Sequence, residues 1–163
     1  MCLFINKKIH KGRNGFHKPR VAKHNILVYK ILELFDDGSK ATPYQYLPIE
    51  FKGGRCHLKT DKMVDSLYFV KDTDNDGCHL DKVGEAIHGF YGEDRTKEEM
   101  RIGRHNDWNF KKYYAVIPKG AQYWVGQDND ICSSEMIIFA SQKSLDKYSK
   151  DNNKVVTLNE ELA

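Results

Sequence analysis

The sequence lacks a long apolar run, and no stretch of it approaches the roughly 18 apolar residues that a membrane-spanning helix needs. Met1 to Ile5 is apolar, but Asn6 and Lys7 end that run at once, which does not fit a secretory signal peptide. We therefore expect a cytoplasmic location and no membrane partner. The chain has 163 residues, 40% of them hydrophobic and 30% charged, which is enough apolar material for one globular core.

Cysteine is also scarce. The four cysteines lie far apart and show no disulfide framework in their spacing, so we expect free thiols in a reducing compartment. Cys132 stands next to Ser133 and close to Glu135, and it would be a candidate nucleophile if His88 or His105 lay beside it. We prefer the simpler interpretation, in which Cys132 is a small buried side chain inside a strand.

Complete metal-binding motifs are missing as well. Asp72, Asp74 and Asp76 match the first half of a calcium-binding loop, but Val83 occupies the position where a closing glutamate would stand. The tripeptide Cys-His-Leu occurs at 56–58 and again at 78–80, and two such pairs could form a zinc site. Adjacent side chains of a strand point to opposite faces, which disfavours that site. We expect no metal and no cofactor.

Acidic residues are absent from the segment between Lys7 and His24, although the whole chain has a net charge of only +3. We expect residues 1–24 to form a basic N-terminal arm and residues 25–163 to form a single globular domain. The arm could bind nucleic-acid phosphates through Lys7, Lys8, Lys11, Arg13, Lys18 and Arg20. We prefer a solvated, loosely ordered segment, because no aromatic ladder or recognition helix accompanies these charges.

Strand-forming residues are plentiful from residue 26 onward. Ile26 to Phe35 is rich in β-branched and aromatic residues, and its apolar run from Ile26 to Leu32 is interrupted only by Lys30, which predicts the first secure strand. Asp36-Asp37-Gly38 predicts a hairpin turn, followed by a returning strand from Thr42 to Phe51 whose two prolines indicate an edge position. Shorter strands are expected at 55–58, 66–70 and 155–158.

Helical signals are fewer. Thr96 to Arg104 is the best helix candidate, because Thr96 and Glu99 have the spacing of a capping box. Ser144 to Lys150 is a second candidate, and Lys82 to His88 could form one or two helical turns. We expect residues 159–163 to be frayed.

The stretch from Lys112 to Ala140 has the densest β-prone content. It predicts a meander of three strands, at Tyr113–Ile117, Gln122–Val125 and Met136–Ala140, with a loop at residues 126–129. These elements together predict an α+β fold, mainly an antiparallel β-sheet with one or two short helices.

Three patches of the sequence carry a resemblance. They are the Ile-Pro-Lys-Gly run at 117–120 with the strands that follow it, the run Val28–Leu32, and the run Ile87–Tyr91. In these patches the chain resembles a family of small uncharacterised proteins from gut Bacteroidetes and their phages. The resemblance implies a phage-related lineage and no particular chemistry.

The run at 117–120 and its aromatic continuation also resemble the C-terminal part of ADP-ribosyltransferase domains. That resemblance implies an arginine on the first strand, where this chain has Lys30, and a catalytic glutamate, for which Glu135 is the nearest candidate. The Ser-Thr-Ser strand of many such enzymes is absent. A degenerate ADP-ribosyltransferase-like enzyme is therefore one alternative function.

A polar and aromatic patch follows the best helix candidate. Arginine can clamp an anion with two hydrogen bonds, and tryptophan offers a stacking face, so we select as ligand-binding candidates Arg101, Arg104, His105, Trp108, Tyr123 and Trp124. Cations that simply complement the end of a helix are the alternative. The expected function is a non-enzymatic binding protein that recognises a host protein or a small anionic ligand, with nucleic-acid binding through the basic arm as a further alternative.

Overall fold

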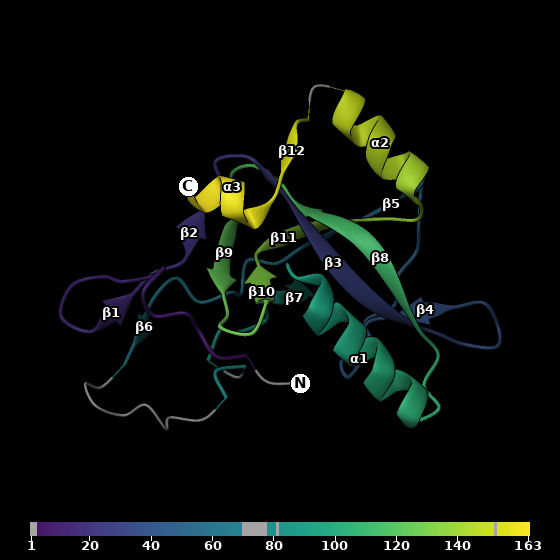
Figure 1. Cartoon of the computed structure of the whole chain (residues 1–163), viewed down its shortest axis with the longest axis horizontal. Helices are drawn as coiled ribbons and strands as arrows, with labels where there is room; N and C mark the ends of the chain where they lie inside the picture. Colours follow the sequence, from purple (N-terminus) through teal and green to yellow (C-terminus); the bar gives the residue numbers. More distant parts are fainter. Residues whose placement is uncertain (1–2, 70–77, 81, 152) are drawn as a thin grey trace.

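The computed structural model describes residues 3–69, 78–80, 82–151 and 153–163, and all statements below refer to these residues. They form an α+β fold dominated by antiparallel strands, which confirms the predicted fold class (Figure 1). The strands are β1 (Phe16–His17), β2 (Arg20–Val21), β3 (Asn25–Leu34), β4 (Lys40–Ala41), β5 (Arg55–Lys59), β6 (Leu67–Tyr68), β7 (Ile87–Phe90), β8 (Phe110–Ile117), β9 (Gln122–Val125), β10 (Asp130–Ser133), β11 (Glu135–Phe139) and β12 (Val155–Val156). The helices are α1 (Glu93–His105), α2 (Gln142–Lys150) and α3 (Leu158–Leu162).

Ten of the described strands form one sheet around β3. The main path of the sheet runs β2-β9-β10-β7-β3-β8-β11-β5, and β4 and β12 pair with β3 beside this path. The longest ladder joins β3 to β8, from Ile26 opposite Ile117 to Glu33 opposite Phe110. Only β12 runs parallel to its partner. The prediction of strand structure at residues 26–35 is therefore confirmed.

β3 and β7 meet at a single residue pair, Tyr29 opposite Phe90. β7 is paired along its whole length with β10, which carries it away from the second half of β3. The two strands therefore part beyond Tyr29, and the sheet opens between them.

Alternation along β3 separates two apolar faces. Ile26, Val28 and Leu32 contribute to the largest buried cluster, on the face that also holds Ala115 and Ile138. The opposite face is covered by helices. α1 closes a cluster that contains Ile31, Phe90 and Phe110, and α2 packs Leu145 and Tyr148 against β8 and β11.

The helix ends differ from those expected. α1 begins at Glu93, three residues before the predicted cap, because Thr96 is buried inside the helix and its hydroxyl donates to the Gly92 carbonyl instead. The chain end is not frayed. Thr157 and Glu160 form a capping box for α3, and the buried Glu161 carboxylate accepts hydrogen bonds from the backbone N–H groups of Lys23 and His24.

Several predicted strands are also corrected. The strand expected at residues 42–51 does not form, since Tyr44 and Tyr46 have positive φ angles of 70° and 54° and turn the chain. The short strand β4 lies just before it. The segment at 82–88 is not helical, and β7 begins at its end. The expected meander is wrong at both steps, because β9 pairs with β2 and β10 and is adjacent to neither β8 nor β11.

The N-terminal segment is packed onto the sheet. Ile5 forms a bridge to Gly126, and the Asn6 N–H donates to the Val125 carbonyl. The buried His10 ring accepts from the Val125 N–H at Nε2 and lies 2.9 Å from the Lys18 carbonyl at Nδ1. Burial lowers the pKa of His10 to about 4, which keeps the ring neutral. Leu3, Ile5 and His10 are thus buried in the core, and this part of the segment is not a loosely ordered tail.

Candidate functional site

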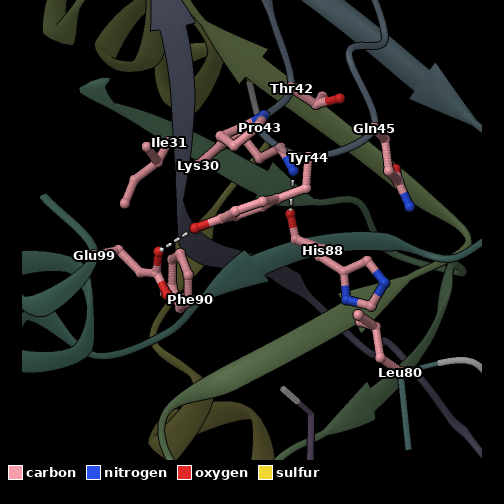
Figure 2. Close-up of a pocket in the computed structure, with 10 residues that line it drawn as sticks. All are labelled: Lys30, Ile31, Thr42, Pro43, Tyr44, Gln45, Leu80, His88, Phe90 and Glu99. Atoms are coloured by element: carbon pink, nitrogen blue, oxygen red, sulfur yellow. Dashed lines mark hydrogen bonds between the residues drawn. The ribbon is translucent and has the colours of Figure 1, made fainter. Parts of the chain in front are cut away.

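A cavity of about 290 Å³ lies where β3 and β7 part (Figure 2). Lys30 and His88 form one side of it, and Tyr44 and Glu99 form the other. The loop between β4 and β5 covers it, and an adjoining cavity of about 610 Å³ shares Lys30, Thr42, Gln45 and His88. We call these two neighbouring cavities together the hollow.

Lys30 is placed in the hollow by the alternation of β3. It follows Val28 and precedes Leu32 on the core-facing side of the strand, so its ammonium group is carried inward. Only 7% of the residue is exposed. Nζ donates to the His88 carbonyl at 2.5 Å, an oxygen that the parting of the strands leaves without a ladder partner on β3.

Lys30 forms no ion pair with a carboxylate of the described residues. Burial alone lowers its pKa from 10.5 to about 8, so most of the side chain is still cationic at neutral pH. A buried ammonium group that bonds only a neutral carbonyl is electrostatically undercompensated. This is the most unusual charge in the hollow.

His88 is neutral under the same conditions. Burial, and after it the charge of Lys30, lowers its pKa to about 4. His88 lies directly opposite Cys132 in the β7–β10 ladder, as a cysteine nucleophile would require. Cys132 is nevertheless fully buried, and burial raises the pKa of its thiol far above its ordinary value. The pair is therefore not an activated thiolate and its base.

Glu99 forms the far wall together with Tyr44. The Glu99 carboxylate accepts from Arg95 Nη2 at 2.8 Å and from the Tyr44 hydroxyl at 3.4 Å, as Figure 2 shows for the tyrosine. Arg95 therefore neutralises this carboxylate on the side away from the cavity. Burial, followed by the nearby Glu99 charge, raises the pKa of the Tyr44 phenol.

The covering loop carries an unusual backbone. Bulky residues rarely adopt positive φ, and two of them do so within three positions, at Tyr44 and Tyr46. Tyr44 also packs edge-on against Trp108, with ring centroids 5.9 Å apart. The strain is concentrated in the segment that closes the cavity, a common location for strained backbone at binding sites.

The lining suits a ligand of mixed character. Ile31, Leu80 and Phe90 supply apolar surface, and Thr42 and Gln45 supply polar groups near the mouth. A ligand with an apolar body and one acidic group would place that group on Lys30. Pockets of this size and composition are typical of small-molecule sites.

The structure separates the ligand-binding residues expected from the sequence. Arg101, Arg104 and His105 are exposed on the last turns of α1, and Trp108 follows them with 38% of its surface exposed. Tyr123 and Trp124 are completely buried on β9, which Figure 1 shows on the other side of the molecule from the end of α1.

The buried tryptophan has a structural role. Trp124 Nε1 donates to the Val64 carbonyl, and the His10 ring lies against its indole at 4.8 Å. Trp124 therefore cannot provide the stacking face of a ligand site near Arg101 and Arg104. Arg104 borders a separate surface hollow of about 240 Å³, together with Lys97 and Lys112.

The two residues matched to ADP-ribosyltransferases lie on opposite faces of the sheet. Glu135 shares a face with Ile137, which packs under α2, whereas Lys30 faces the inner cluster. Glu135 Oε1 lies 2.5 Å from His57 Nε2 on the neighbouring strand. The geometry gives no support to a shared active site, and the activity stays a prediction that release of nicotinamide from NAD would test.

The basic candidates of the N-terminal segment are mostly at the surface. Lys8, Lys11, Arg13 and Lys18 are exposed, while Arg20 donates to the Ile9 carbonyl through Nη1. Asp72, Asp74 and Asp76 lie outside the described residues. Within the described part of the chain, no group of three or more His, Cys, Asp or Glu side chains could hold a metal ion.

One sequence signal for the hollow was present. Lys30 is the only charged residue between Ile26 and Leu32, and it stands at a position where alternation requires an inward side chain. Arg95 and Glu99 also have the four-residue spacing of a helical ion pair. The contribution of Tyr44 and His88 depends on the parting of β3 and β7, which no local pattern indicates.

The chain matches no protein-family model, no curated protein and no solved structure. None of the described helices has the length and apolar character needed to cross a membrane. A functional interpretation therefore rests on the geometry and charge of the hollow itself.

Proposed function

We propose that this chain is a non-enzymatic binding protein that receives a small anionic ligand in the hollow at Lys30. The observation that supports this proposal is a buried ammonium group at a cavity wall, with no carboxylate partner among the described residues. The ligand would supply the missing negative charge.

The environment of Lys30 makes the burial of its charge costly. Removing an ammonium group from water costs several kcal/mol unless an opposite charge and hydrogen bonds offset the loss. The His88 carbonyl offsets only part of it. A ligand carboxylate would form a charge-assisted hydrogen bond with Nζ, and such bonds contribute about 1.5–3 kcal/mol each.

The shape of the hollow narrows the ligand class. An apolar body would lie against Ile31, Leu80 and Phe90, while the acidic group would reach Lys30 at the seam. Among the described residues, the opposite wall offers no free cation to a second acidic group, because Arg95 is paired with Glu99 there. The proposed ligands are therefore monocarboxylic acids with a short aliphatic or aromatic body.

Titration with hexanoate and with benzoate, followed by NMR shifts or calorimetry, tests the proposal. Lys30→Met keeps the length of the side chain and removes its charge, so it is expected to weaken binding at least tenfold. Lys143→Met removes an exposed lysine of α2 and provides the matched control. Equal affinity in the two variants, or no saturable binding to the wild type, would contradict the proposal.

The exposed cations of the N-terminal segment support a second candidate function, nucleic-acid binding. Lys8, Lys11, Arg13 and Lys18 project from one short stretch without acidic neighbours in sequence. Binding of duplex DNA would weaken steeply with salt, because each neutralised phosphate releases a counterion. Replacing these four residues with serine should reduce that salt dependence, and an unchanged slope would remove this candidate.

A further inference from the structure

Another cavity lies near the other side of the Arg95–Glu99 ion pair. It measures about 400 Å³, and its walls are the first turns of α1 and the loop that joins β9 to β10. Its charged side chains are Asp94, Arg95, Glu98, Asp128 and Asp130. Phe4 of the N-terminal segment closes one side.

Two buried polar atoms of this cavity have no hydrogen-bond partner among the described protein atoms. They are Asp130 Oδ1, an acceptor, and Arg95 Nη1, a donor. The Asp130 side chain is only 6% exposed, and Arg95 Nε lies 3.5 Å from Oδ1 without hydrogen-bond geometry. Unsatisfied buried groups are rare in folded proteins, and each requires an explanation.

The surrounding charge makes the cavity acidic. Four carboxylates line it against one guanidinium group, and that guanidinium is already held by Glu99 at 2.8 Å and by the Phe90 ring at 5.4 Å. Glu98 Oε2 lies 3.7 Å from Arg95 Nη1, which is an ion-pair distance but not a hydrogen bond. The site therefore retains an excess of negative charge after Arg95 is counted.

We propose that this cavity binds a small primary amine that also carries a neutral oxygen acceptor. The ammonium group of the ligand pairs with the Asp130 carboxylate, and its hydroxyl or carbonyl oxygen accepts from the Arg95 guanidinium group. Because Oδ1 and Nη1 are buried, each side chain rotates to bring its unpaired atom to the cavity wall. Asp94, Glu98 and Asp128 contribute longer-range attraction for the same cation. This inference is independent of the anion site at Lys30.

An organic amine fits better than a metal ion. A divalent cation requires several oxygen ligands at short distance, and the described residues hold no group that could provide them. Arg95 would also repel a compact divalent ion at the position of Oδ1. An amine with an adjacent oxygen satisfies the unpaired acceptor and the unpaired donor together.

Amino alcohols test this assignment directly. Binding of 4-amino-1-butanol to the wild-type protein is measured by NMR titration at pH 8, with 1-butylamine and 1-butanol as the two partial ligands. The amino alcohol should bind tightest, 1-butylamine several-fold more weakly, and 1-butanol without saturation.

Asp130→Asn keeps the shape of the side chain and removes its charge, and it should weaken the amino alcohol at least tenfold. Asp61→Asn, at an exposed position outside the cavity, is the control and should leave binding unchanged. Asp128→Asn, at an exposed position of the same cavity, should give an intermediate loss and covers the case in which the Asp130 variant does not fold. The proposal is overturned if no amine saturates the protein, or if the cavity variants bind as well as the control does.

Discussion

The two cavities differ in the sign of the charge that they leave uncompensated. The Lys30 cavity is lined largely by apolar side chains around one cation, whereas the Asp130 cavity is lined by carboxylates around one shared guanidinium. They nevertheless share a border. Phe90 lines the first cavity, and Asp130, its ladder partner on β10, lines the second.

The Arg95–Glu99 pair separates the two charge environments. Glu99 faces the Lys30 cavity but is neutralised by Arg95, and Arg95 faces the Asp130 cavity but is neutralised by Glu99. Each cavity is therefore left with the charge of its other buried residue. The Arg95–Glu99 pair, on successive turns of α1, thus allows two neighbouring cavities of a small domain to prefer ligands of opposite charge.

Loss of this pair should have the largest effect. In Glu99→Ala, Arg95 loses its shortest ionic contact while its side chain stays 14% exposed, and we expect a loss of about 3–5 kcal/mol in the free energy of unfolding. Glu98→Ala removes a more exposed carboxylate at 3.7 Å from the same arginine and should cost less than about 1 kcal/mol. Urea denaturation of both variants measures the difference, and similar losses would show that Arg95–Glu99 does not act as a buried pair.

The second prediction concerns the acidic cavity and pH. Burial raises the pKa of Asp130 from 3.8 to about 7 in spite of the nearby Arg95 charge. Between these values the folded protein binds the proton more tightly than the unfolded chain does, so stability contributed at low pH is lost as the pH rises from about 4 to 7. The loss should be roughly 3–4 kcal/mol.

Asp130→Asn should lack this pH dependence. The informative quantity is the unfolding free energy of the wild type minus that of the variant, measured at several pH values. His10 and His88, with pKa values lowered to about 4, produce an opposite slope between about pH 4 and 6.5 that cancels in the subtraction. A difference that does not vary with pH would mean that Asp130 is solvated.

The third prediction concerns the pH dependence of stability that Lys30 causes, which has the opposite sign to that of Asp130. The pKa of Lys30 falls from 10.5 to about 8, so the unfolded chain binds the proton more tightly between these values. Stability should therefore rise by roughly 3–4 kcal/mol as the pH increases from about 8 to 10.5. Lys30→Met should lack this rise and should be at least as stable as the wild type at pH 7.

Thermal or urea unfolding of the wild type and Lys30→Met across that range measures the effect. Lys143→Met, which changes an exposed lysine, should retain the full pH dependence of the wild type. If Lys30→Met is instead strongly destabilised at pH 7, the bond to the His88 carbonyl outweighs the cost of burying the charge.

The smallest effect is expected at the covering loop. Tyr44→Phe removes one long hydrogen bond, of 3.4 Å, to Glu99, and should lower the unfolding free energy by only about 0.5 kcal/mol. Tyr46→Phe, in a side chain that is 63% exposed, is the matched control and should be neutral. Denaturation midpoints would distinguish them, and a loss well above 1 kcal/mol would show that Tyr44 anchors the loop much more strongly.

Local sequence patterns predicted those elements whose own residues favour one type of secondary structure. β3 was predicted because apolar and β-branched residues fill Ile26 to Leu32 except at Lys30, and α2 because its residues favour helix over a full two turns. β7 was not predicted, because Ile87–Phe90 includes a glycine. This segment becomes a strand through its ladder with β10. Long-range pairing overrides local propensity in such short elements.

The N-terminal segment shows how charge can hide a core element. Leu3 and Ile5 are buried and Phe4 between them is partly exposed, which is the alternation of a half-buried strand. The many cations that follow directed the interpretation toward a free arm. The sequence does not show that His10 is a buried side chain that joins two segments. One hydrogen-bond partner is the nearby Lys18, but the other is Val125, which is more than a hundred residues away.

The candidate site could be predicted only in part, because its residues also come from distant parts of the sequence. Lys30 was visible as a charge in an apolar strand, but the residues that make it a cavity wall come from the loop after β4, from β7 and from α1. Trp124 was selected as a ligand contact because it is aromatic, although complete burial on β9 gives it a packing role.

The order of strands in the sheet also determines how the chain must fold. β3 ends at Leu34, but its longest partner begins at Phe110, and β5 must await a partner that begins at Glu135. Closing such long loops before the ladders contribute slows folding in small domains. During synthesis, the first hundred residues therefore leave the ribosome before the strands that complete their sheet, and their apolar side chains remain accessible to chaperones until residues 110–139 have emerged.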